Sequence, residues 1–412
     1  MVRIRKTHII FAILVIMFLF SIYLRVFGFF TNNFQYLRNI DSFMFLRRTI
    51  DIVQTGGTPS VDYLMLAPVG KAVTFGPVLY SYIAAYSYMF INVVAPVQVW
   101  QWLIWFPVIL ASLVIFPMYF IGKALYSRKA GLFAGFFVTF SAANVARSLG
   151  GDPDTDAIVI LIPIICMAFF FLSYKALEKG CLFTKKSLLF AALTGISLAI
   201  FANIWPGYWY VLWIITGFVI LYLILDTGLS YFLHKVQPKE IATKHKAMLL
   251  NLAIIIICFV ILTTITMGFN YAASAVAEPL SLSGISRSGD AALKSESGEF
   301  PNVYVSVQEL MAGGELKDII TKTSNIELSG IAILISPFML TVYVILYTLY
   351  RFIRHRDHLD TFTLLVIWFV GGIFASMVAV RFTMFLVGVI SLGSAIFFAR
   401  IWDYAFEKAK RK

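Results

Sequence analysis

Ten stretches of the chain are apolar over nearly the full length of a membrane-crossing helix, and polar residues gather between them. A helix needs about 20 mainly apolar residues to cross the hydrocarbon core of a bilayer. We therefore predict an all-α polytopic membrane protein. The predicted spans are residues 9–28, 99–122, 130–146, 157–173, 188–205, 207–225, 248–268, 328–350, 361–379 and 383–400.

A further apolar run, residues 72–97, is ambiguous because it contains Pro77 and Pro96 and follows a long polar loop. If it does not cross, both termini and four basic loops share one side of the membrane. That side then carries 22 Lys and Arg against seven Asp and Glu, out of 33 and 21 in the chain. Since basic loops stay in the cytoplasm, we expect residues 72–97 to lie along the membrane or re-enter it, within a first outer loop (29–98).

The composition agrees with a membrane protein: 60% of the residues are hydrophobic and 13% are charged, whereas soluble proteins carry about 25% charged residues. The net charge of +12 is explained by the basic loops that determine how the chain inserts and by contact with anionic lipids. It gives no reason to expect nucleic-acid binding. Cys166, Cys181 and Cys258 show no CxxC spacing, so neither a zinc site nor a disulfide framework is supported.

The stretch Gly-Gly-Asp-Pro-Asp-Thr-Asp, within an outer loop at 147–156, places Asp152, Asp154 and Asp156 directly before an apolar helix. One of these side chains could simply cap that helix. Three neighbouring carboxylates repel one another unless a cation neutralises them, however, and an Asp-x-Asp turn can direct two of them to one ion. All five histidines fall on the inner side, so a metal here would have oxygen ligands only, which favours Mg²⁺ or Mn²⁺.

Three further charged residues on the outer side are candidates for the site. Asp41 follows the first helix and could be a solvated loop acid, and Glu309 lies in a second large outer loop, residues 269–327. Loops of that length are commonly functional lids or disordered. Arg381 sits at the outer end of an apolar helix, where it either snorkels to the interface or binds an anionic headgroup.

Together these segments resemble the membrane portion of the catalytic subunit of oligosaccharyltransferases, the archaeal and bacterial single-chain type within the GT-C glycosyltransferases. The similarity covers nearly the whole chain, and five motifs in family order are highly specific. The matching segments are NIDSFMFLRRTID, ARSLGGDPDTDAIVILIP, ANIWPGYWYV, FPNVYVSVQE and VRFTMF.

The resemblance implies a GT-C helical bundle with about 10–13 transmembrane helices. It also implies transfer of an oligosaccharide from a polyprenyl pyrophosphate (dolichyl or undecaprenyl) to Asn of Asn-x-Ser/Thr in an acceptor polypeptide. Asp41, Asp154, Asp156 and Glu309 then surround an Mn²⁺ or Mg²⁺ ion, and Asp41 and Glu309 also face the acceptor amide. Arg381 and Arg147 match positions near the lipid-linked pyrophosphate. These are the expected site residues: Asp41 and Glu309 as catalytic groups, Asp41, Asp154, Asp156 and Glu309 as metal ligands, and Arg381 and Arg147 as pyrophosphate-binding groups.

The chain departs from the family at its end, because members normally continue into a soluble acceptor-recognition domain. We expect residues 1–412 to be the transmembrane catalytic domain alone, truncated, split or naturally short, so that a separate soluble domain or subunit becomes a further partner beside membrane lipids. The expected location is the plasma membrane, with the active site facing outside and both termini cytoplasmic. Two alternatives are a GT-C transferase that uses a polyprenyl-phosphate sugar with a non-sequon acceptor, and a non-enzymatic transporter or scaffold.

Overall fold

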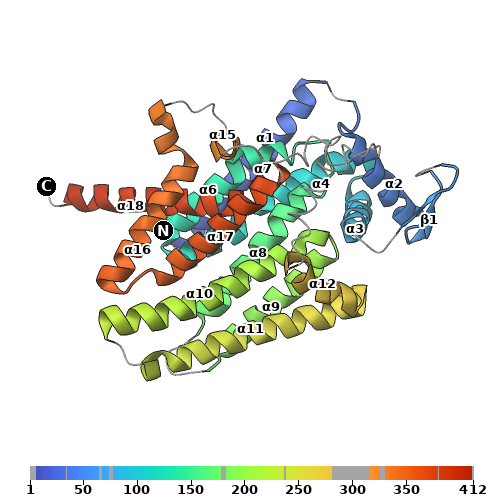
Figure 1. Ribbon diagram of the computed structural model, residues 1–412. Helices are drawn as coiled ribbons and strands as arrows, with labels where there is room; N and C mark the ends of the chain where they lie inside the picture. Colours follow the sequence, from blue (N-terminus) through green and yellow to red (C-terminus); the bar gives the residue numbers. More distant parts are fainter. Residues whose placement is uncertain are drawn as a thin grey trace, which may run out of the picture.

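The structure is a computed structural model of a helical membrane protein (Figure 1). It describes residues 6–33, 35–64, 67–73, 78–177, 182–235, 238–280, 316–324, 330–378 and 380–410. Within these ranges, eight helical segments are long and apolar enough to cross a membrane. The eight are Thr7–Thr31, Val99–Leu125, Asp156–Lys175, Lys185–Ala202, Pro206–Leu229, Ala242–Met267, Leu359–Met377 and Arg381–Phe406.

Nearly all of the secondary structure is helical. The first half contains α1 (Lys6–Thr31), α2 (Ile40–Thr55), β1 (Val61–Asp62), β2 (Lys71–Ala72), α3 (Leu79–Val94), α4 (Val99–Leu113), α5 (Ile115–Leu125), α6 (Arg128–Phe140), α7 (Ala142–Ala146), α8 (Asp156–Lys175) and α9 (Lys185–Ala202). The second half contains η1 (Pro206–Tyr208), α10 (Trp209–His234), α11 (Pro238–Met267), α12 (Phe269–Leu280), α15 (Leu316–Ser324), η3 (Gly330–Ile335), α16 (Pro337–His355), α17 (Leu359–Val378), η4 (Val380–Phe385) and α18 (Leu386–Lys410).

Two of the ten predicted spans, 130–146 and 328–350, are not among the eight segments of the described chain. The first became α6, which ends at Phe140 because Ser141 adopts an extended conformation. Its 13 residues measure about 20 Å, less than the roughly 30 Å of the hydrocarbon core. The second became α16, whose last turn carries Arg354 and His355. Both helices pack against α18 inside the bundle.

Polar side chains set several helix starts. The Ser127 hydroxyl accepts a hydrogen bond from the Ala130 amide at the start of α6, and Ser336 caps α16 in the same way. Thr184 and Ser187 form a reciprocal capping box at the start of α9. Such caps bond amides that would otherwise have no partner in the first turn, so the short polar links between apolar runs determine where each helix begins.

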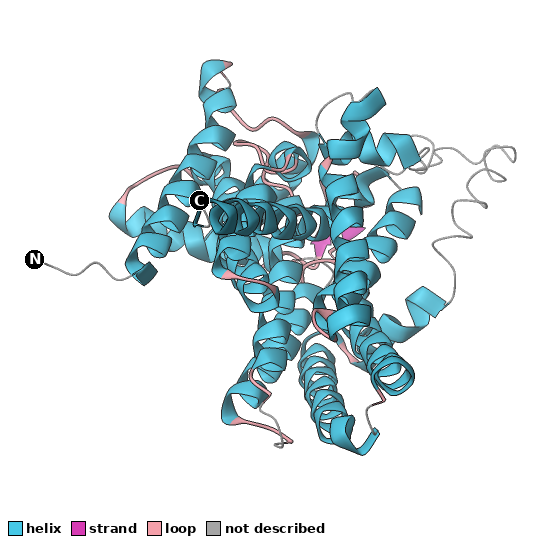
Figure 2. Ribbon diagram, turned by 90° about the vertical axis from the view of Figure 1, so that its left-hand side faces the viewer, coloured by secondary structure: helices cyan, strands magenta, loops and turns pink. Residues whose placement is uncertain are grey.

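The bundle has two distinct ends (Figure 1). Helix α1 begins and helix α18 ends on the left of the view, an end that we call the terminal end. Helices α2 and α3 and strand β1 lie on the right, and we call this the α2 end. Figure 2 views the bundle from the terminal end and shows the other helices around a central group of helices.

The ambiguous run at 72–97 folds into the end of β2 and helix α3. Helix α3 has 16 residues and is about 24 Å long, shorter than a typical span. It packs on α2 and α4 and exposes large apolar side chains, among them Phe90, Val93 and Val94. An apolar surface of this kind is typical of a helix that contacts lipid or another protein.

The core runs along α8, which is buried on nearly all sides by its neighbours. Phe170, Phe171, Tyr174 and Phe218 form a cluster of edge-to-face rings between α8 and α10. Because α8 begins at Asp156, this packing fixes the position of the helix whose first residue belongs to the acidic motif.

Candidate functional site

The loop before α8 is held by backbone hydrogen bonds to three other segments. The Gly150 amide donates to the Arg25 carbonyl (3.0 Å), the Gly151 amide donates to the Ile104 carbonyl (3.3 Å), and the Gly151 carbonyl accepts from the Arg38 amide (2.8 Å). Gly151 has φ +81°, and a Cβ there would meet Cε2 of Phe29 at 2.5 Å. Only glycine fits position 151 of this turn, so the second glycine of the motif has a steric reason.

Arg381 contacts both aspartates of the Asp-x-Asp motif. Its Nη2 lies 2.6 Å from Oδ1 of Asp156 and 3.6 Å from Oδ2 of Asp154. Nη1 of Arg147 lies 3.3 Å from the other carboxylate oxygen of Asp156. Since one guanidinium nitrogen reaches both acids, the structure brings together residues that are 225 positions apart in sequence.

Burial makes the charge of Asp154 costly. It raises the pKa of Asp154 to about 6, and the neighbouring charge of Asp156 adds to the rise, while Arg381 and the bonds from Thr155 oppose it. Those bonds come from the amide and hydroxyl of Thr155 to Oδ1 of Asp154, at 2.5 and 3.1 Å. The raised pKa means that burial and the neighbouring Asp156 disfavour the ionised form of Asp154, a cost that a nearby positive charge reduces.

The start of α2 lies beside the same loop. The Ser42 hydroxyl donates to Oδ1 of Asp152 (3.3 Å), and Asn39 also bonds this carboxylate. The pKa of Asp152 is raised mainly by burial, against these two hydrogen bonds. Asp41, the residue next to Ser42, is exposed in the first turn of α2. The Asp41 motif and the Asp-x-Asp motif therefore share the α2 end of the bundle.

The oxygen chemistry of Asp154 and Asp156 fits a hard divalent cation. Within the described residues, no three His, Cys, Asp or Glu side chains are grouped closely enough to form a complete metal site. Glu309, the expected fourth ligand, lies outside the described residues. The Asp pair is therefore the part of the expected ligand set that the structure brings together, and Arg381 now balances its charge.

Sequence patterns did not identify Tyr80 of α3, a fully buried residue close enough to Asp154, Asp152 and Asp156 to feel their charges. Its hydroxyl has no hydrogen-bond partner in the part of the chain that the structure describes. A buried phenol without a partner is uncommon, which sets Tyr80 apart from the other tyrosines of the described core. No motif carries Tyr80, and only the packing of α3 reveals it.

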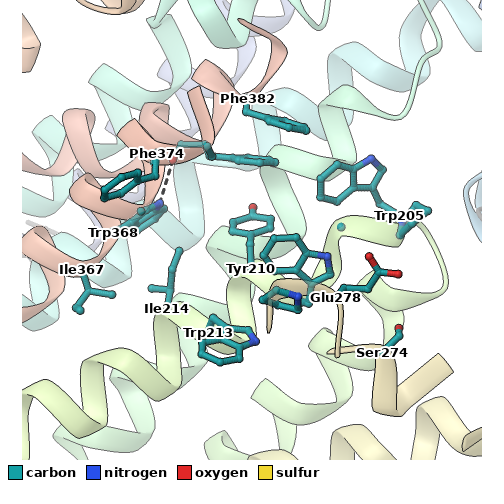
Figure 3. A pocket seen from close by; sticks show the side chains of 18 of the residues that line it. Trp205, Tyr210, Trp213, Ile214, Ser274, Glu278, Ile367, Trp368, Phe374 and Phe382 are labelled. Carbon is teal, nitrogen blue, oxygen red and sulfur yellow. Dashed lines mark hydrogen bonds between the residues drawn. The ribbon is translucent and has the colours of Figure 1, made fainter. Parts of the chain in front are cut away.

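A cavity of about 1070 Å³ opens next to this site (Figure 3). It lies between η1, α10, α12, α17 and η4, and aromatic rings dominate its wall. These include Trp205, Trp209, Tyr210, Trp213, Trp368 and Phe385. The Trp368 indole donates to the Phe385 carbonyl (3.0 Å), which fixes one wall of the cavity. Phe382 and Phe385 belong to η4, the short helix that also carries Arg381. The apolar cavity therefore lies beside the cationic side chain of Arg381.

The family model described as oligosaccharyl transferase STT3, N-terminal, matches residues 8–409. A dolichyl-phosphooligosaccharide-protein glycotransferase of Methanococcus voltae is 24% identical over 410 residues, covering 92% of this chain and 43% of the relative. The chain thus spans a little less than half the length of the curated relatives that it matches.

Two solved structures of the Archaeoglobus fulgidus oligosaccharyltransferase are also similar. One, titled as AglB in complex with an inhibitory peptide and a dolichol-phosphate, aligns with TM-score 0.65 and 17% identity, covering 98% of this chain and 52% of that one. The other, titled as a complex with Zn and sulfate, aligns with TM-score 0.65 and 19% identity, covering 95% and 49%. At this identity they establish the GT-C fold. With a family match over nearly all of its length, the chain belongs to the STT3 family of oligosaccharyl transferases.

Proposed function

We propose that this protein transfers an oligosaccharide from a polyprenyl pyrophosphate to the side-chain nitrogen of Asn in Asn-x-Ser/Thr of an acceptor polypeptide. One observation carries the proposal: η4 places Arg381 against Asp154 and Asp156 and also lines the large aromatic cavity. A donor made of an apolar chain and an anionic pyrophosphate needs both features side by side. Relatives named as dolichyl-phosphooligosaccharide-protein glycotransferases support it.

The reaction has two physical demands. The carboxamide nitrogen of Asn is a poor nucleophile because its lone pair is delocalised into the carbonyl, and the leaving pyrophosphate gains negative charge. We propose that Asp41 and Glu309 accept hydrogen bonds from the acceptor amide and orient it. Arg381, assisted by Arg147, stabilises the charge that develops on the pyrophosphate, an effect that is often the largest in catalysis.

We propose that Asp154 and Asp156 hold an Mn²⁺ or Mg²⁺ ion, with Asp41 and Glu309 as further ligands. A bound divalent cation supplies electrostatic stabilisation of the leaving phosphate oxygens. The chain's own contribution is to hold two partly buried carboxylates together, one of which has a pKa raised to about 6. The similar Archaeoglobus structure titled as a complex with Zn and sulfate supports metal binding by a protein of this fold.

The aromatic cavity fits the isoprenoid chain of the donor. Most of its lining side chains are apolar, and the polar ones, which include Ser274 and Glu278, come from α12. We propose that the donor lies in this cavity with its pyrophosphate toward Arg381. The similar structure titled with a dolichol-phosphate and the size of the cavity, about 1070 Å³, support this placement.

The proposed orientation puts the α2 end outside the plasma membrane and both termini in the cytoplasm. The basic loops support it, because they lie at the terminal end and pair there with acids of neighbouring helices. Lys175 lies 2.5 Å from Asp360, and Lys129 pairs with Asp403. Membrane lipids, the lipid-linked oligosaccharide and the acceptor polypeptide are the proposed partners.

The test is glycan transfer by the purified protein in detergent, with mass spectrometry of the product. We expect glycosylated Asn within Asn-x-Ser/Thr, dependence on Mn²⁺ or Mg²⁺, and loss of transfer in Asp154→Ala and Glu309→Ala. Transfer that persists without metal in both variants contradicts the proposed site. A product glycosylated elsewhere than a sequon contradicts the proposed acceptor.

The cavity has a test of its own, based on two glycines whose added Cβ would meet no atom within 4 Å. Gly371 lines the cavity, whereas Gly228 lies near the end of α10 that faces away from it. Gly371→Trp should fill part of the cavity and raise KM for the lipid-linked donor. Gly228→Trp, the matched control, should leave KM unchanged; equal values for both variants would exclude the cavity as the donor site.

A further inference from the structure

Arg25 of α1 is a cation buried inside a membrane helix. It is fully buried, and it lies within the first membrane-spanning segment, Thr7–Thr31. In the described part of the chain, its guanidinium donates hydrogen bonds to hydroxyl and carbonyl oxygens. A charge in this position is expensive and is usually retained for a function.

The guanidinium joins three separate segments. Nη1 donates to the Ser21 hydroxyl of its own helix (2.6 Å), Nη2 donates to the Thr139 carbonyl near the end of α6 (2.7 Å), and Nε donates to the Ser148 hydroxyl (2.9 Å). The Thr139 carbonyl belongs to the last turn of α6, where carbonyls lack partners within the helix and the helix dipole is negative. The Arg25 guanidinium is therefore stabilised by hydrogen-bond acceptors and by the partial negative charge at the end of α6, and these hydrogen bonds involve no carboxylate.

Ser148 connects Arg25 to the Asp-x-Asp loop. Its hydroxyl, besides accepting from Arg25, lies 2.5 Å from the Asn144 carbonyl of α7. Two residues later, the Gly150 amide donates to the Arg25 carbonyl (3.0 Å). Side chain and backbone of one residue thus hold the segment that leads into Asp152, Asp154 and Asp156.

We propose that Arg25 is a positioning residue, whose fork of donors fixes the loop at residues 147–155 so that Asp154 and Asp156 are presented together. This inference rests on the proposed function in one respect only, namely that Asp154 and Asp156 bind a metal ion. The planar guanidinium is required because it directs several donors at fixed angles, whereas a lysine ammonium is a point charge on a flexible stem. The loop itself should therefore loosen when Arg25 loses its bond to Ser148, the partner that lies in the loop.

Two serines provide a matched pair for the experiment. Ser148 and Ser21 both bond the Arg25 guanidinium through their hydroxyls, but Ser148 lies in the loop and Ser21 in α1. We would measure hydrogen exchange of the Gly150 and Gly151 amides in Ser148→Ala and Ser21→Ala. Direct Mn²⁺ binding would be measured on the same detergent-solubilised proteins by electron paramagnetic resonance of the free ion.

We expect Ser148→Ala to speed exchange of both glycine amides and to weaken Mn²⁺ binding by about tenfold, the scale of one hydrogen bond to a charged group. Ser21→Ala should change neither. Arg25→Met should weaken Mn²⁺ binding further, with partial recovery in Arg25→Lys, which keeps the charge but not the fork.

Loop exchange that is equally slow in Ser148→Ala and Ser21→Ala would overturn the proposed role of Arg25, whatever the metal results are. If the loop loosens as expected but even the unchanged protein binds no Mn²⁺, the positioning role stands and the proposed metal site fails. If Arg25→Met does not fold, the two serine variants still decide the question.

Discussion

Replacing Arg381 with methionine should separate metal binding from catalysis. Nη2 of the Arg381 guanidinium lies 3.6 Å and 2.6 Å from carboxylate oxygens of Asp154 and Asp156, respectively. A cation that binds the same carboxylates must compete with it. Arg381→Met therefore removes a competitor for the metal and, at the same time, removes the cation proposed to stabilise the leaving pyrophosphate.

The magnitude follows from the ion pairs. Two unit charges about 4 Å apart attract by about 4 kcal/mol at an effective dielectric constant near 20, but desolvation offsets much of this gain. The side chains of Arg381 and Asp156 are 23% and 3% exposed, so a net contribution of about 1.5–3 kcal/mol is reasonable for a charge-assisted bond. Its removal should tighten Mn²⁺ binding by roughly 10- to 150-fold.

The assay is Mn²⁺ binding and glycan transfer on the same preparations, with Arg354→Met as the control. Arg354 is exposed in the last turn of α16, at the terminal end, and its replacement should change neither quantity. Tighter Mn²⁺ binding combined with lost transfer supports the reasoning. Unchanged or weaker Mn²⁺ binding in Arg381→Met would refute it, since it would mean that the metal does not compete for these two carboxylates.

Three further outcomes follow from the structure. The folded-state pKa of Asp154 is about 6, against an ordinary 3.8. Without added metal, the Tm of the protein should therefore rise as pH falls from 7 to 5, while Mn²⁺ binding weakens below pH 6. A pH-independent Mn²⁺ affinity over this range would contradict the raised pKa. Asp226→Asn should lower Tm, because the buried Asp226 lies 3.1 Å from His245 and 3.9 Å from Arg356 and the substitution removes the negative charge that these partners face. Transfer per folded molecule should persist, and an unchanged Tm would count against the pair. Tyr80→Phe removes a buried hydroxyl without a partner and should leave Tm equal or slightly higher; a clear fall in Tm would show that the hydroxyl is bonded.

The sequence predicted the fold class well because a membrane imposes a simple pattern. Eight of the ten predicted spans correspond to helical segments long enough to cross, since each apolar run must satisfy its own backbone hydrogen bonds in lipid. Of the two exceptions, α6 is too short because the helix breaks at Ser141, whereas α16 is as long as some of the eight segments and differs from them in its basic last turn. Their place inside the bundle depends on partners such as α18, which hydropathy does not record.

The candidate site was predictable only in part. The motifs named Asp154, Asp156 and Arg381, and the structure joins them; their catalytic and metal-binding roles remain predictions. Arg25 and Tyr80 were missed because each is a single polar residue in an apolar helix, without a local pattern. What distinguishes them is burial and the identity of the atoms around them, and both arise only when helices distant in sequence pack together.

The span of 225 residues between Asp156 and Arg381 has a consequence for biogenesis. A ribosome makes the chain from its N-terminus, so the acidic turn is complete long before η4 emerges. During that interval the carboxylates need another source of positive charge, and Arg147, nine residues from Asp156 and 3.3 Å away, is already present. Arg147 is thus the first of the two arginines available to pair with Asp156, and Arg381 can join it only after η4 has been synthesised.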